Sequence, residues 1–65
     1  MYYRDIAAQM QHDTANWGLR DAIISATLDH GMLDVTKALN HLFEMGDVTA
    51  SEHELGASVI LAYAR

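Results

Sequence analysis

The chain has 65 residues with nine acidic and four basic side chains, a formal net charge of −5 and no cysteine. This length predicts a single α-helical domain, residues 1–65, whose core alone is marginal in size. Without cysteine, disulfides and thiolate metal sites are excluded, so tight helix packing and self-association remain as sources of stability. The acidic charge disfavours direct contact with nucleic acid or anionic membranes and favours a partner with a basic surface.

The first twenty residues lack the pattern of a signal peptide, because Arg4 and Asp5 fall where an apolar region should begin. The longest nearly apolar run, residues 55–64, is too short to span a bilayer. Together with the absence of cysteine, these features predict a cytoplasmic protein that does not enter membranes.

The first half of the chain predicts one or two helices. A helix that begins near Tyr2 has the spacing of a one-faced amphipathic helix. Its apolar residues are Tyr3, Ile6, Ala7 and Met10. Polar residues 11–16 and Gly18 then indicate either a break or a weak stretch of one longer helix, and both remain open. A second helical pattern runs to about Asp29, and Gly31 followed by Met32 is typical of a Schellman ending.

The third helix has the clearest pattern of the chain. Asp34 is its candidate N-cap, and Gly46 is expected to end it. Its apolar face consists of Val35, Ala38, Leu39 and Leu42. This i, i+3, i+4, i+7 spacing predicts that one side of the helix packs against the core.

The fourth helix begins with two overlapping capping boxes, Thr49 with Glu52 and Ser51 with Glu54. Residues 58–63 could also form a strand, since valine and isoleucine favour strands, but the alanines and the upstream caps favour a helix. The expected fold class is therefore all-α: a small antiparallel bundle of three or four helices, completed by dimerisation.

From Leu55 onward the fourth helix is apolar or small on nearly every side, which is typical of a helix buried all round. We expect Leu55, Val59 and Ala62 to face the third helix, while Ile60, Leu61 and Tyr63 point elsewhere. Gly56 and Ala57 are small enough for a neighbouring helix to approach closely. A homodimer would cover the remaining surface. The predicted oligomer interface consists of Leu55, Val59, Ile60, Leu61 and Tyr63.

No pattern in the sequence indicates catalysis, a cofactor or a metal ion. The chain has neither a cysteine nucleophile nor a Gly-x-Ser-x-Gly elbow, and its glycines are too isolated for a phosphate-binding loop. His41 and Glu44 share a helix face but in the reverse order of the di-iron motif. We therefore expect a protein that is not an enzyme and that needs no cofactor.

Residues 35–45, a short turn and residues 49–64 resemble a helix-turn-helix in outline. However, the second helix begins with Thr-Ala-Ser-Glu-His-Glu, and Lys37 is the only lysine or arginine between residues 34 and 64. Base and phosphate contacts need the opposite composition. DNA binding is therefore kept only as a second alternative function.

The expected function is that of a small acidic accessory or regulatory protein, which acts as a modulator or inhibitor by binding a larger protein and which forms a homodimer. An alternative is an acidic decoy whose carboxylates mimic nucleic-acid phosphates on a basic partner. Aromatic side chains are typical anchors at such interfaces, and carboxylates would carry the decoy contacts. The candidate partner-binding residues are Tyr2, Tyr3, Trp17, Asp5, Asp13, Asp21 and Asp29.

Overall fold

A computed structural model describes residues 2–64, and all regular secondary structure in this range is helical. The four helices are α1 (Tyr3–Trp17), α2 (Leu19–His30), α3 (Met32–Glu44) and α4 (Ala50–Tyr63). The all-α prediction is thereby confirmed. Residues 58–63 lie in α4, so the alternative of a strand there was wrong.

Two glycines divide the first half of the chain into separate helices. Gly18 has a φ of 94° and its N–H donates to the Thr14 carbonyl at 2.9 Å, so the break left open by the sequence occurs here. Gly31 has a φ of 88° and bonds the Thr27 carbonyl in the same way. Because glycine adopts positive φ without steric strain, one residue suffices to end one helix and begin the next.

The start of α3 differs from the prediction. The helix begins at Met32 and is preceded by Gly31, so Asp34 lies in the first turn and is not the N-cap. Met32 is accordingly the first residue of α3 and not the trailing residue of a Schellman ending. The Asp34 carboxylate is still well placed, because negative charge in the first turn interacts favourably with the helix dipole.

The turn between α3 and α4 is built by two local motifs. After Met45, Gly46 has a φ of 80°, and the N–H groups of Gly46 and Asp47 donate to the carbonyls of Phe43 and Leu42. These two bonds form a Schellman motif. At the start of α4, Glu52 N–H donates to Thr49 Oγ1 at 3.1 Å and Thr49 N–H donates to Glu52 Oε1 at 2.8 Å. The predicted Thr49–Glu52 capping box is confirmed.

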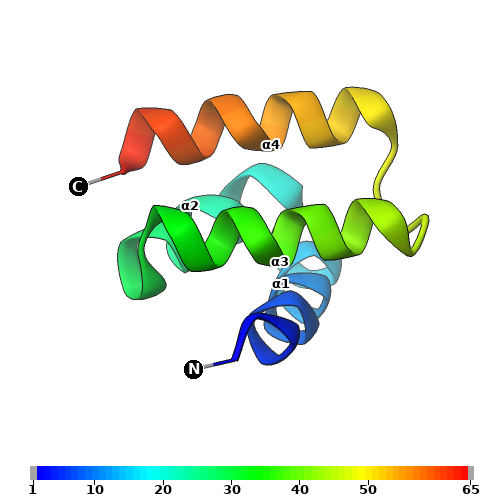
Figure 1. Cartoon of the computed structure of the whole chain (residues 1–65), viewed down its shortest axis with the longest axis horizontal. Helices are drawn as coiled ribbons and strands as arrows, with labels where there is room; N and C mark the ends of the chain where they lie inside the picture. The colour runs from blue at the N-terminus through cyan, green and yellow to red at the C-terminus, as the bar shows by residue number, and fades with distance from the viewer. Residues whose placement is uncertain (1, 65) are drawn as a thin grey trace.

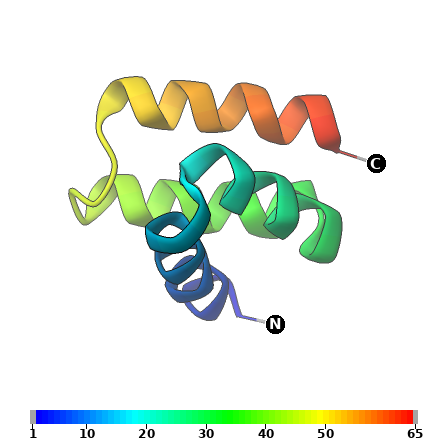
Figure 2. The ribbon, with the colours of Figure 1, turned by 180° about the vertical axis from the view of Figure 1, so that it is seen from behind.

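The helices α3 and α4 lie side by side and antiparallel along the long axis of the molecule (Figure 1). The helix α1 crosses α3 steeply and is seen nearly end-on, while α2 lies behind α3 in Figure 1 and in front of it in Figure 2. Both α1 and α4 pack against α2 and α3, which places the core between them. The fold is thus a helical bundle in which α3 and α4 form an antiparallel hairpin and α1 is a cross-member. The pair lacks the angled arrangement of a helix-turn-helix.

Gly56 lies where α4 meets both α2 and α3. A Cβ atom at this position would lie 2.8 Å from Leu39 Cδ2 and 2.9 Å from Ile23 Cδ1. The small residue therefore permits close approach of helices within the same chain. The fully buried side chains around this crossing include Ile23, Leu39 and Ile60.

The orientation expected for α4 was right for Val59 and Leu61 but wrong for Leu55, Ile60 and Ala62. Ile60 is only 1% exposed and Val59 is also buried, whereas Leu55 is 50% exposed and Ala62 is exposed. The reason is Gly56, which must face inward at the crossing. Since residues four apart share a helix face, Ile60 follows Gly56 into the core.

Candidate interaction surfaces

Among residues 2–64, the two most exposed large apolar side chains lie at one end of the α3–α4 hairpin. Leu33 is 74% exposed and Leu61 is 70% exposed. The register of the hairpin follows from His53 Nε2 and Asn40 Oδ1, which are 2.7 Å apart. Leu61 lies eight residues after His53 in α4. Because the two helices are antiparallel, it lies beside the α3 residue eight positions before Asn40, in the first turn of α3. Leu61 thus reaches the level of Met32 and Leu33, and we call these three residues the apolar end.

The outward side of α4 near the apolar end carries no charge. Residues 55–64 contain no acidic or basic side chain. The exposed residues of this segment are Leu55, Ser58, Leu61 and Ala62. The apolar end therefore adjoins an uncharged strip in a molecule that is otherwise rich in exposed charges, and such a surface is typical of protein contacts.

The predicted aromatic anchors do not form one surface. Tyr2 and Tyr3 lie together at the start of α1, with ring centroids 4.7 Å apart, and Tyr3 packs edge-on against His41 at 5.6 Å. Trp17 is exposed at the opposite end of the helix. The Arg4 guanidinium beside the Tyr3 hydroxyl, and secondly the Tyr2 hydroxyl, hold the pKa of Tyr3 below its ordinary value of 10.0.

The four aspartates proposed as partner contacts are also separated. Asp13 is only 8% exposed and accepts a hydrogen bond of 2.9 Å from Gln9 Nε2. Asp5 lies in the first turn of α1, and Asp21 and Asp29 lie near opposite ends of α2. Although these aspartates recur every eight residues in the sequence, their positions are not equivalent, and the Asp13 side chain has a structural role.

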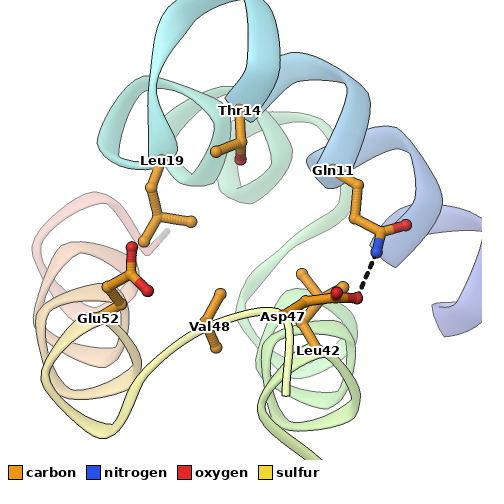
Figure 3. Close-up of a pocket in the computed structure, with 7 residues that line it drawn as sticks. All are labelled: Gln11, Thr14, Leu19, Leu42, Asp47, Val48 and Glu52. Carbon is orange, nitrogen blue, oxygen red and sulfur yellow. Dashed lines mark hydrogen bonds between the residues drawn. The ribbon is translucent and has the colours of Figure 1, made fainter. Parts of the chain in front are cut away.

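A hollow of about 260 Å³ lies beside the turn between α3 and α4 (Figure 3). We call it the turn hollow. Its apolar lining consists of Leu19, Leu42 and Val48, and its polar lining of Gln11, Thr14, Asp47 and Glu52. These residues come from all four helices and the turn. No local motif connects them, so no sequence pattern indicates this site beyond the capping box expected for Glu52.

None of the helices among residues 2–64 is long and apolar enough to cross a membrane. The same residues contain no group of three or more histidine and acidic side chains placed to hold a metal ion. Comparisons with protein-family models, curated proteins and solved structures find no match for this chain.

Proposed function

We propose that this protein is a small acidic accessory protein that acts by binding other proteins and that it forms a homodimer through its apolar end. The observation that supports the dimer is the exposure of Leu33 and Leu61 at the same level of the hairpin. Burying a leucine side chain contributes about 1.5–3 kcal/mol. A two-fold dimer would bury Leu33 and Leu61 of both protomers, which makes four leucine side chains. The resulting free energy is substantial for a domain with marginal stability.

The proposed interface is smaller than the set expected from the sequence. Val59 and Ile60 are already buried within the protomer, and Tyr63 packs against its core. Leu61 therefore remains as the central contact from α4. Leu33 and Met32 of α3 join it, and Leu55 lies farther along the helix.

Sedimentation equilibrium over a wide range of protein concentration tests the dimer. Leu61→Asp and Leu33→Asp should each yield a monomer, because a carboxylate in the interface would lose its hydration. Met45→Asp is the matched control, since Met45 is an exposed apolar residue at the other end of α3 and receives the same charge. It should leave the dimer intact. An unmodified protein that stays monomeric at every concentration would contradict the proposal, as would equal effects of all three substitutions.

We rank the two alternative functions below this one. The decoy relied on Asp5, Asp13, Asp21 and Asp29, and one of these carboxylates, that of Asp13, is buried and therefore unable to meet a basic partner. The helix-turn-helix function relied on α3 and α4, which lie antiparallel in Figure 1. A gel shift with mixed DNA at low salt tests the latter, and a shifted band would restore it.

A further inference from the structure

The turn hollow combines an apolar lining with an excess of hydrogen-bond acceptors. Of its seven lining residues, Asp47 and Glu52 carry negative charge and none is lysine, arginine or histidine. In Figure 3 the two carboxylates lie on opposite sides of the hollow, with Thr14 and Val48 between them. The site is therefore complementary to a positively charged group attached to an apolar chain.

Both carboxylates are held in place while one oxygen of each stays available. Gln11 Nε2 donates to Asp47 Oδ2, and Thr49 N–H donates to Glu52 Oε1. Among residues 2–64, neither Asp47 Oδ1 nor Glu52 Oε2 accepts a hydrogen bond from a side chain. The backbone beneath them is fixed by the Schellman motif and the capping box. Because this geometry exists before any ligand arrives, binding costs little ordering of the site.

The other polar side chains of the hollow add further acceptor capacity. Thr14 Oγ1 donates its proton to the Met10 carbonyl at 2.6 Å, which leaves the hydroxyl oxygen able to accept. The apolar side chains of Leu19, Leu42 and Val48 offer a surface for methylene groups. At about 260 Å³ the hollow is smaller than most sites for drug-sized ligands and suits a single side chain.

We propose that the turn hollow receives one arginine side chain of a partner protein, with its methylene groups on Leu19, Leu42 and Val48 and its guanidinium between Asp47 and Glu52. Arginine fits better than lysine because its planar head has five donors spread over two sides, which can meet carboxylates on both sides at once. The stem of such a side chain packs readily on apolar surface. This site lies at the other end of the α3–α4 hairpin from the apolar end, so the inference is independent of the proposed dimer.

Nuclear magnetic resonance titration with the capped tripeptide Gly-Arg-Gly tests the proposal. Its matched neutral control is Gly-citrulline-Gly, since citrulline has the shape of arginine without the charge. We expect the arginine peptide to shift the amide resonances of Gln11, Thr14, Val48 and Glu52, and added salt to weaken the effect. The citrulline peptide should bind at least about tenfold more weakly, a difference of about 1.4 kcal/mol.

The double variant Asp47→Asn, Glu52→Gln should lose the response to the arginine peptide. Both changes preserve the internal contacts, because asparagine still accepts from Gln11 and glutamine serves in a capping box. Asp5→Asn with Asp29→Asn is the control, since it changes net charge equally at exposed positions away from the hollow. Equal binding of the citrulline peptide, equal losses in the two double variants, or shifts confined to other residues would overturn the proposal. A Gly-Lys-Gly peptide that binds as tightly would overturn the choice of arginine.

Discussion

The substitution Gly56→Ala tests whether Gly56 mainly weakens α4 through its low helix propensity or mainly provides space for close packing against α2 and α3. In an exposed helical position, alanine is more favourable than glycine by about 0.8–1.0 kcal/mol. At position 56, however, the added Cβ would lie 2.8 Å from Leu39 Cδ2 and 2.9 Å from Ile23 Cδ1. Both contacts are closer than real Cβ atoms tolerate, so at least two methyl groups must move.

The energetic cost of moving these methyl groups decides whether Gly56→Ala stabilises or destabilises the protein. Leu39 and Ile23 are fully buried, so their methyl groups can move only against packed neighbours. Overpacking of this kind costs about 1–3 kcal/mol. Subtracting the gain in helix propensity leaves an expected net destabilisation of about 1 kcal/mol. In a domain of this size such a loss lowers Tm by about 4–8 °C. Gly56→Val should cost more, because its extra methyl groups enter the same crossing.

Urea unfolding followed by circular dichroism measures the change in the free energy of unfolding. Because dimerisation would make this quantity depend on protein concentration, all variants are compared at one fixed concentration or in the monomeric Leu61→Asp background. The matched control is the pair Ser58→Gly and Ser58→Ala, because Ser58 is exposed in the same helix. The difference between these two variants gives the propensity gain in α4 itself. The reasoning would be refuted if Gly56→Ala stabilised the protein by as much as this control difference, since no steric cost would then exist.

Two further predictions concern single contacts. Thr49→Ala should lower the free energy of unfolding by about 0.5–2 kcal/mol, because it removes the hydroxyl that caps α4. The control Ser51→Ala lies inside the helix and should have a much smaller effect in the same urea experiment. Equal effects of the two substitutions would contradict the assignment of Thr49 as the cap. An ultraviolet titration of tyrosine ionisation should find Tyr3 titrating below its ordinary pKa of 10.0, and Arg4→Gln should reduce this shift because the guanidinium is its largest cause and the Tyr2 hydroxyl only the second. Since the folded-state pKa is the lower one, any stabilisation from the Tyr3 phenolate is present above the unfolded pKa and lost as the pH falls through the folded pKa. Three tyrosines that titrate alike in both proteins would contradict this.

The positions of the helices could be predicted because their ends depend on neighbouring residues. The Thr49–Glu52 capping box and the positive φ of Gly31 and Gly46 act within a few residues of each helix end. The break at Gly18 was harder to predict. Polar residues 11–16 lie in α1 and resemble a linker in composition, but their side chains bond within the helix, as Thr14 does to the Met10 carbonyl.

The rotation of α4 could not be predicted, because a helix that is apolar on nearly every side has no preferred face in its sequence. Its orientation depends on Gly56 and on Ile23 and Leu39, which belong to other helices. The turn hollow escaped prediction for a similar reason. Its two carboxylates are local to the α3–α4 turn, but the other walls come from Gln11, Thr14 and Leu19, which are far away in the sequence.

The two proposed surfaces are built from different sets of helices. The apolar end needs only the α3–α4 hairpin, whereas the turn hollow also needs Gln11 and Thr14 of α1 and Leu19 of α2. Along α4, the twelve residues from Thr49 to Leu61 span about 18 Å at a rise of about 1.5 Å per residue. This exceeds the separation of about 7–10 Å beyond which substitutions usually act independently. Pairing through the apolar end would therefore leave both hollows of a dimer open, and failure of either proposal would leave the other intact.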